Sequence, residues 1–247
     1  MKNIIEKTAS SFEKSFSEDA YYNLQTQDKN HLSLIIESLD LTPGKQILDL
    51  GTGSGYLAFH LAETNPQCHI VGLDIVQNTI SRNASIAKEN RLKNIDFLIY
   101  DGINFPFEKD IFDIIVSRYA FHHFPLIEKS FNEIARVLRE KGQLFISDPT
   151  PNKVDQNHFI DKYMQMKDDG HQKFYTLDEF SELGKFKNLI LVSNDMTKIR
   201  FPRKDAQQYL KLLNTTKDHI LDAYQVEIID DEIYITEDVL NISFMKV

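Results

Sequence analysis

Residues 47–55 read Ile-Leu-Asp-Leu-Gly-Thr-Gly-Ser-Gly, and residues 71–74 read Val-Gly-Leu-Asp. The first stretch joins an apolar strand to a glycine turn that opens a helix, and the second is a strand that ends in a carboxylate. Glycines at alternate positions let the backbone turn sharply and let a ligand approach the bare main chain. A carboxylate about 20 residues further on suits the hydroxyls of a ribose. The two stretches together predict a site for a nucleotide-type cofactor.

The glycine spacing separates two classes of cofactor. In the dinucleotide fingerprint, a third glycine or alanine follows the second glycine by three residues and lets helix and strand pack closely around a pyrophosphate. Tyr56 stands at that position here. The chain instead alternates an acid with three glycines, at Asp49, Gly51, Gly53 and Gly55. This alternation resembles motif I of the class I S-adenosylmethionine-dependent methyltransferases.

The resemblance implies a role for three acidic residues. Asp49 would face the ammonium of the cofactor's methionine part, and Asp74 would bind the ribose hydroxyls. Asp101 follows a third strand, at residues 95–100, and would face the adenine amino group. The complete set of cofactor-binding positions implied by the resemblance is Asp49, Gly51, Thr52, Gly53, Gly55, Asp74, Ile75, Asp101, Gly102 and Arg118.

Strand and helix patterns alternate through the first 149 residues. A fourth strand, at residues 112–117, is mostly apolar, as expected of a strand buried on both faces of a parallel sheet. Apolar residues at helical spacing then predict a helix from residue 127 that Lys141 and Gly142 close, before a strand at residues 143–147. This order predicts a doubly wound α/β sheet. The resemblance implies a Rossmann-like sheet of seven strands, mostly parallel with an antiparallel C-terminal hairpin strand, and helices on both faces.

The pattern beyond residue 150 is less regular. A sixth strand is predicted at residues 189–192, and residues 199–202 are expected to leave it. Residues 230–232, Asp-Asp-Glu, are predicted to form a solvated turn between the last helix and the following strand. We expect a single domain with three parts, which are a helical cap at residues 1–40, a cofactor-binding core at 41–149 and, at 150–247, an elaboration that forms the substrate pocket and contributes the last two strands.

A second motif follows the fourth strand. Residues 117–124 read Ser-Arg-Tyr-Ala-Phe-His-His-Phe, and residues 133–138 read Glu-Ile-Ala-Arg-Val-Leu. These stretches resemble the ubiquinone/menaquinone-biosynthesis branch of small-molecule methyltransferases and its uncharacterised bacterial relatives. The resemblance is strong over residues 41–149 and weaker afterwards. It implies the fold and S-adenosylmethionine as cofactor, whereas the acceptor does not transfer because this superfamily has many activities.

His122 and His123 are the candidate catalytic residues. They lie just past the fourth strand, and an imidazole can accept a proton from an acceptor that is weakly acidic. Adjacent residues face different ways, so at most one is expected to enter the pocket. A packed, hydrogen-bonded histidine is the alternative for each. No further ligands with suitable spacing accompany the pair, so no metal site is predicted.

The acceptor pocket is expected to draw on segments outside the core. In relatives, an N-terminal piece closes over the cofactor, although the aromatic residues of this segment could instead fill the core. The candidate substrate-binding residues are Tyr22, His123, Asp148, His171 and Arg200.

Composition favours a compact enzyme with a small-molecule acceptor. The net charge is −9 and the basic residues are scattered, which disfavours a nucleic-acid partner. Apolar runs of membrane-spanning length are absent from the sequence, and the single cysteine, Cys68, excludes an internal disulfide framework. We expect a cytoplasmic protein without a membrane partner. The oligomeric state stays open, a homodimer included.

The leading hypothesis is transfer of a methyl group from S-adenosylmethionine to an oxygen, carbon or nitrogen atom of a small molecule by in-line displacement. Two rivals keep the same fold. One is an NAD-linked oxidoreductase, which changes the cofactor, and the other is a non-catalytic module that binds S-adenosylmethionine as a signal.

Overall fold

A computed structural model of the chain describes residues 2–18, 28–167, 169–203 and 206–247. Its strands are β1 (Gln46–Leu50), β2 (His69–Asp74), β3 (Ile95–Ile99), β4 (Phe112–Arg118), β5 (Leu138–Thr150), β6 (Leu189–Arg203), β7 (Glu227–Ile229) and β8 (Glu232–Lys246). Its helices are α1 (Lys2–Glu18), α3 (Lys29–Glu37), α4 (Tyr56–Thr64), α5 (Gln77–Glu89), the 3₁₀ turn η1 (Phe121–His123), α6 (Ile127–Val137), α7 (Phe159–Gln165), α8 (Leu177–Lys185), α9 (Ala206–Thr215) and α10 (Asp218–Ala223).

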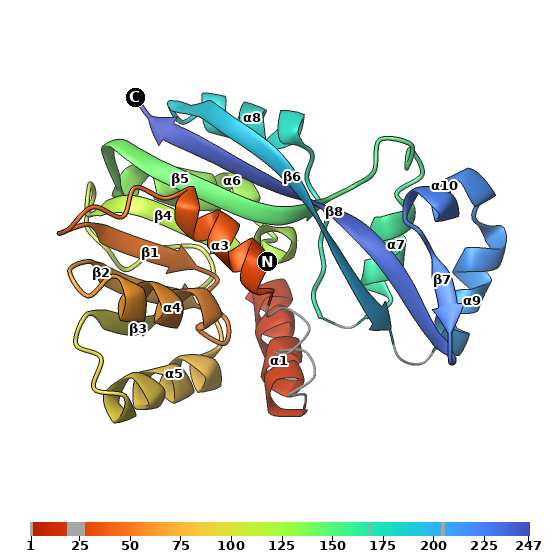
Figure 1. The fold of residues 1–247 in the computed structure, drawn as a ribbon, viewed down its shortest axis with the longest axis horizontal. Helices are drawn as coiled ribbons and strands as arrows, with labels where there is room; N and C mark the ends of the chain where they lie inside the picture. Colours follow the sequence, from red (N-terminus) through yellow and green to blue (C-terminus); the bar gives the residue numbers. More distant parts are fainter. Residues whose placement is uncertain (1, 19–27, 168, 204–205) are drawn as a thin grey trace.

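All the strands belong to one sheet (Figure 1). Its order is β3-β2-β1-β4-β5-β8-β6, and the short β7 pairs with β8 outside this path. The first five strands are parallel, whereas β8 runs antiparallel to β5, β6 and β7. The doubly wound sheet with an antiparallel C-terminal hairpin is therefore confirmed, and β7 adds an eighth strand to the seven that were expected.

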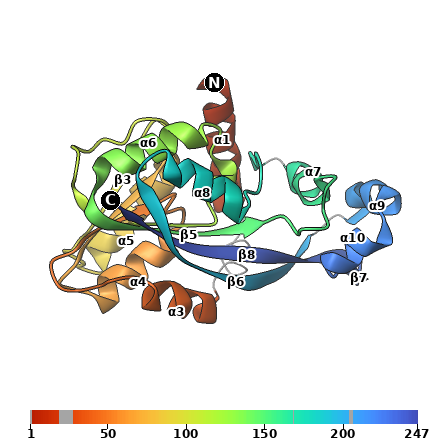
Figure 2. The same ribbon diagram turned by 90° about the horizontal axis from the view of Figure 1, so that it is seen from above.

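Helices cover both faces of the sheet, which explains why the central strands are apolar throughout. Figure 2 shows α6 and α8 above the sheet and α3 and α4 below it. On the side of α6, Phe131 and Ile134 pack with Phe180 of α8, all fully buried. On the other side, Ile35 of α3 and Leu61 of α4 pack against the strands. Helix α3 is thus part of the helical layer that packs on this face of the sheet.

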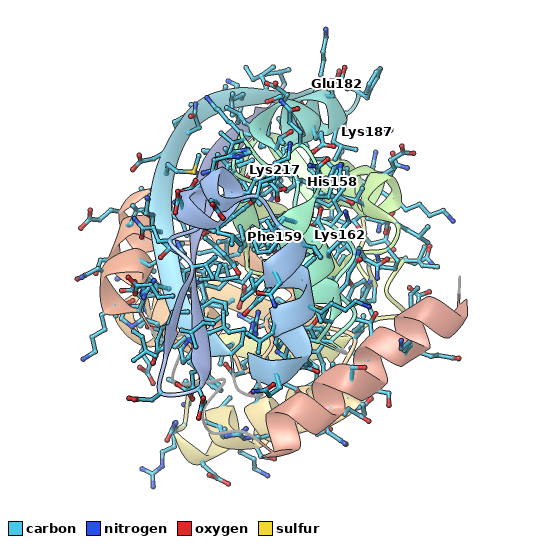
Figure 3. The ribbon with its side chains drawn as sticks, turned by 90° about the vertical axis from the view of Figure 1, so that its right-hand side faces the viewer. His158, Phe159, Lys162, Glu182, Lys187 and Lys217 are labelled. Carbon is cyan, nitrogen blue, oxygen red and sulfur yellow. The ribbon has the colours of Figure 1, made fainter. Side chains whose placement is uncertain are left out.

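The antiparallel pair of β6 and β8 extends past the parallel strands and carries a third cluster of buried residues. This cluster joins α7, α9, α10 and the near end of β8, and its largest side chains include Tyr163, Tyr209 and Tyr224. Figure 3 views the molecule from this end and labels Phe159 and Lys162 of α7. None of the helices in the described ranges is long and apolar enough to cross a membrane.

The structure corrects the predicted boundary between α6 and β5. The helix ends at Val137 and the strand begins at once at Leu138, instead of after a glycine stop at residues 141–142. Leu138 pairs with Phe112 and Gln143 with Ile114, so the strand bulges between these pairs. Lys141 takes φ +62° within the bulge. The Lys-Gly pair therefore bends a strand and does not end a helix.

Two further predictions were wrong in the C-terminal part. Strand β6 does not release residues 199–202 but continues to Arg203, because Pro202 is tolerated on a strand at the edge of a sheet. The acidic residues at 230–232 were predicted correctly as a solvated turn but wrongly as following the last helix, since the exposed Asp230 and Asp231 form the turn of the β7–β8 hairpin. Both take positive φ, at +49° and +63°, which is the backbone of a two-residue hairpin turn.

Phe131 gives a direct test of this packing. We expect Phe131→Ala to lower the free energy of unfolding by about 3–5 kcal/mol, because the side chain of this α6 residue is fully buried against α8 and the sheet. Phe186→Ala is the matched control, since that ring is 77% exposed and should change stability by less than about 0.5 kcal/mol. Urea unfolding followed by circular dichroism measures both. Equal losses in the two variants would contradict the packing.

Candidate functional site

The turn after β1 lies at the end of the sheet that is formed by the carboxyl ends of the parallel strands. Gly51 has φ +74° and Gly53 has φ +49°, and such a left-handed backbone favours glycine. A Cβ atom on Gly51 would lie 2.5 Å from the Cβ of Ala120, which follows β4. The first glycine is thus required by close packing as well as by conformation, and it leaves the main chain of the turn bare.

Asp74, the last residue of β2, holds this turn in place. Its carboxylate accepts hydrogen bonds from the Gly53 amide at 2.8 Å and from the Val76 amide at 3.1 Å. A carboxylate offers about four acceptor sites, so these two bonds leave acceptor capacity for a ligand. Burial raises the pKa of Asp74, and the amides of Gly53, Val76 and Ile75 act against that rise.

Asp49 lies deeper than Asp74, on β1 itself. The side chain is 2% exposed, and its carboxylate accepts a hydrogen bond from the Thr52 hydroxyl at 2.7 Å. The pKa of Asp49 is raised to about 7, chiefly by burial and also by the nearby Asp74, whereas the Thr52 hydrogen bond acts to lower it. A cationic group of a ligand would stabilise the charged form of this buried acid.

These groups line a cleft that is open to solvent and holds about 1050 Å³ of empty space, open solvent included. Helix α1 lies beside the edge of the sheet that holds the turn (Figure 1) and contributes Ile5, Thr8 and Phe12 to the lining. A Cβ atom on Gly102 would lie 2.8 Å from Ile5, so α1 packs directly on the loop after β3. We call this space the first chamber.

The donor set of the first chamber suits S-adenosylmethionine better than a dinucleotide. Two buried carboxylates, Asp49 and Asp74, line it with one cation, Arg118. Such a set matches the ammonium, sulfonium and ribose hydroxyls of S-adenosylmethionine, whereas a pyrophosphate would meet two like charges. Tyr56 begins α4 at the position where a dinucleotide site needs a small residue.

A smaller cavity of about 480 Å³, which we call the second chamber, adjoins the first. Tyr119 and His123 line both, so they form the junction. Five segments of the chain supply the other lining residues of the second chamber. These residues are His122, Pro149, Met164, Lys167, Asp169, Phe174, Ile199, Phe201, Arg203 and Glu237.

The two histidines of η1 have different surroundings. Nδ1 of His122 pairs with the carboxylate of Asp148 at the end of β5, and the His122 amide donates to the other oxygen of Asp148 at 3.1 Å. Neither ring nitrogen of His123 forms a hydrogen bond with any described residue. The His123 ring contacts Phe12 of α1 edge-on, with ring centroids 4.7 Å apart. His122 is therefore anchored, and His123 faces the junction without a polar partner within the described ranges.

Burial sets the protonation of this group. It lowers the pKa of His122 and of His123 well below the usual value, and electrostatic repulsion from neighbouring histidines acts in the same direction, from His171 on both rings and from His122 on His123. Burial also raises the pKa of Asp148 to about 7. His123 is consequently neutral at neutral pH and able to accept a proton.

A hydrogen-bond network that the sequence did not reveal fixes Tyr119. His31 of α3 is buried, and its Nε2 lies 3.1 Å from Oδ1 of Asn241. That oxygen only accepts, because the amide nitrogen of Asn241 donates to the carbonyl of Val239. Nε2 of His31 therefore carries the proton, and Nδ1 accepts a hydrogen bond from the hydroxyl of Tyr119 at 3.0 Å. Ser147 of β5 also contacts His31, at 2.8 Å from Nε2.

The structure brings most of the predicted cofactor residues together. Eight of the ten line the first chamber, namely Asp49, Gly51, Thr52, Gly53, Asp74, Ile75, Gly102 and Arg118. Gly55 and Asp101 do not. Gly55 instead allows close packing, because a Cβ atom there would lie 2.7 Å from Phe59. The Asp101 carboxylate binds the amides of Ile103 and Asn104 in its own exposed loop.

The predicted substrate residues are more scattered. His123 lies at the junction, and Asp148 lines neither chamber but pairs with Nδ1 of His122. His171 is buried behind the chamber wall, with Nε2 2.8 Å from Oδ1 of Asp161. Arg200 lies away from both chambers and pairs with Glu227 of β7. Tyr22 lies outside the described residues.

Comparisons with known proteins identify the family. A family model described as "Methyltransferase domain" matches residues 41–217. The chain belongs to the methyltransferase domain family. The expected resemblance to class I methyltransferases is thereby confirmed.

Two curated relatives place this methyltransferase domain more closely. The chain is 29% identical over 153 residues to the uncharacterized methyltransferase YcgJ of Bacillus subtilis, covering 62% of this chain and 60% of that protein. It is 37% identical over 106 residues to demethylmenaquinone methyltransferase of Lactococcus lactis, covering 42% of each. The chain thus spans less than two thirds of the length of the relatives it matches. The expected similarity to the quinone-biosynthesis branch is confirmed.

Solved structures show the same fold. The crystal structure of YcgJ from Bacillus subtilis superimposes with a TM-score of 0.78 at 23% identity, covering 89% of this chain and 99% of that one. A putative methyltransferase from Bacillus halodurans superimposes with a TM-score of 0.79 at 17% identity, covering 88% and 99%.

The raised pKa of Asp49 predicts how stability depends on pH. In the unfolded chain this acid ionises near pH 4, whereas the folded protein holds its proton up to about pH 7. The charge therefore destabilises the fold progressively between these values, and Asp49→Asn removes that cost. We expect the variant's advantage in unfolding free energy over the natural protein to grow by a few kcal/mol from about pH 4 to pH 8.

Thermal unfolding without ligand, run across this pH range, measures the difference. Asp222→Asn is the control, since that exposed carboxylate has no hydrogen bond or ion pair with a described residue. If Asp49→Asn and the natural protein differed in unfolding free energy by the same amount at all pH values, the raised pKa of Asp49 would be contradicted.

Proposed function

We propose that this protein transfers a methyl group from S-adenosylmethionine to a small molecule. The observation that carries the proposal is the first chamber, in which the bare turn at Gly51 and Gly53 lies between the buried carboxylates of Asp49 and Asp74. The family match supplies methyl transfer as the reaction class. The cofactor contributes a methyl group already activated on a sulfonium centre.

Each carboxylate has a binding role in this proposal. Asp74 would bind the ribose hydroxyls with the acceptor sites that the Gly53 and Val76 amides leave unused. Asp49 would pair with the methionine ammonium. Helix α1 would cover the bound cofactor with Ile5, Thr8 and Phe12 and exclude water from the reacting atoms.

His123 is the base that we propose for acceptors that must lose a proton. It lies where the two chambers meet, it is neutral at neutral pH, and its ring has no polar partner among the described residues. A proton released by an acceptor in the second chamber would pass to His123. His122, held by Asp148, would orient its neighbour, because the two rings lie with centroids 4.0 Å apart.

The rivals are less well supported. An NAD-linked oxidoreductase would place a pyrophosphate beside two carboxylates, and the family match does not favour it. A non-catalytic binding module would not need an unpartnered imidazole at the junction of two chambers. Isotopically labelled S-adenosylmethionine, offered with a broad panel of metabolites, tests transfer directly. Calorimetric titration with S-adenosylhomocysteine and with NAD tests the choice of cofactor, and tight binding of NAD alone would overturn the proposal.

Asp74→Ala should weaken binding of S-adenosylhomocysteine by about 1.5–3 kcal/mol, because hydrogen bonds to a charged group are lost. Calorimetry measures the change. Asp96→Ala is the control, since this acid on β3 is exposed and outside both chambers. Unchanged affinity in Asp74→Ala, with the fold intact by circular dichroism, would contradict the ribose assignment.

His123→Gln should lower the turnover number by about 10²-fold or more for a proton-bearing acceptor. Affinity for S-adenosylhomocysteine should stay unchanged, because the role concerns the acceptor. Since the pKa of His123 is lowered well below 6.5, activity of the natural enzyme should fall only as the solution becomes acidic, and this limb should vanish in the variant. His219→Gln on α10, an exposed site, is the control. Equal turnover in both variants would exclude His123 as the base.

A further inference from the structure

Two opposite charges line the second chamber without pairing with each other. Glu237 of β8 is 2% exposed, and its carboxylate forms no hydrogen bond or ion pair with any described residue. Arg203 ends β6, and no carboxylate of the described residues lies within 4.0 Å of its guanidinium. Each group therefore lines the chamber without a direct counter-ion among the residues that the structure describes.

The pairing register of β6 and β8 sets the distance between the backbone positions of Glu237 and Arg203. Glu237 lies opposite Ile199 on β6, and Arg203 follows four residues further along the same strand. Residues at even spacing share one face of a strand, so Ile199, Phe201 and Arg203 line the chamber together with Glu237. Four residues span about 13 Å of strand, which leaves room for a ligand between the charged ends.

The other groups around Glu237 do not neutralise it. Asp169 and Lys167 form an ion pair of their own at 3.2 Å. The pKa of Glu237 is raised to about 7, chiefly by burial, while the charge of Arg203 lowers it and the charges of Asp148 and Asp169 raise it. Arg203 itself donates to the sulfur of Met164 at 3.0 Å and lies over the Phe201 ring, 4.8 Å from its centroid.

Apolar side chains form the remaining walls. Phe174 and Phe201 supply aromatic faces, and Pro149, Met164 and Ile199 complete the surface. A ligand that fits this chamber therefore has an apolar body of modest size in addition to any charged groups.

We propose that the second chamber binds the methyl acceptor as an amino-acid-type molecule, with its ammonium group on Glu237, its carboxylate on Arg203 and an apolar side chain against Phe174 and Phe201. This assignment rests on the proposed function, which makes the chamber the acceptor site. The assignment of the cofactor to the first chamber does not depend on this identification of the acceptor.

The charge pattern discriminates against simpler ligands. An amine without a carboxylate would leave Arg203 without a partner and would add a further cation to the chamber. A carboxylate without an amine would leave the buried Glu237 unpaired beside a new anion. Burying an unpaired charge is costly, so a molecule that satisfies both groups is favoured over either.

Four probes of similar size test the assignment, which are L-phenylalanine, phenethylamine, 3-phenylpropionate and 3-phenylpropanol. Their binding is measured by calorimetry on the full chain saturated with S-adenosylhomocysteine. We expect L-phenylalanine to bind at least about tenfold more tightly than each of the other three, since it alone satisfies both charges. Equal affinities across the four probes, or absence of binding by all of them, would overturn the assignment.

Variants identify the residues responsible. Glu237→Gln and Arg203→Gln should each weaken L-phenylalanine binding by about 10- to 150-fold, the loss expected for a hydrogen bond to a charged group. Glu237→Gln should also reduce the preference for L-phenylalanine over 3-phenylpropionate, a change that a merely structural role would not produce. Asp238→Asn is the matched control, because it is the neighbouring acid on β8, points to the opposite face and contacts Lys198 instead.

The titration with S-adenosylhomocysteine that precedes these measurements separates the two proposals. Failure to bind S-adenosylhomocysteine would contradict the proposed function. Normal binding of S-adenosylhomocysteine, followed by unchanged L-phenylalanine affinity in both Glu237→Gln and Arg203→Gln, would overturn the acceptor assignment and leave the cofactor site intact.

Discussion

The rest of the structure depends on how the glycine turn after β1 is held against its neighbours. Ala120 approaches Gly51 so closely that no side chain fits there, and the carboxylate of Asp74 binds the Gly53 amide. One turn thereby ties together the ends of β1, β2 and β4. Its polar groups are fixed by the fold before a ligand arrives, and such preorganisation lowers the free-energy cost of binding. The first chamber is consequently lined at this turn by main chain that the fold holds in place.

Burial dominates the electrostatics of both chambers. It raises the pKa of Asp49, Asp148 and Glu237 to about 7 and lowers the pKa of His122 and His123. Acids and bases are thus both driven toward their neutral forms near physiological pH. A charged ligand changes this balance more than it would at a solvated surface, because opposite charges attract more strongly where water is excluded. Perturbed groups of this kind gather at functional sites.

The parallel half of the sheet could be predicted from the sequence because its signals are local. Glycine spacing, apolar strands and helical periodicity lie within a few residues of one another, and they identified the turn from Gly51 to Gly55 together with Asp74. The antiparallel half could not be predicted as well. Residues 199–202 were expected to leave β6, which instead continues as an edge strand through Pro202, and the three residues of β7 are too few to show a periodicity. The second chamber depends on the register that sets Glu237 opposite Ile199, and no local pattern reveals such a pairing.

The junction between the chambers shows why distant segments matter to the site. Tyr119 takes φ +55°, an unfavourable backbone for an aromatic residue, and its hydroxyl donates to His31 of α3. Burial and the charge of Arg118 lower the pKa of His31, which keeps its Nδ1 free of a proton and able to accept. Because His31 also binds Asn241 of β8, the wall that both chambers share is held from the C-terminal hairpin and from a helix that precedes β1. The position of Tyr119, which with His123 lines both chambers, therefore depends on contacts with both elements.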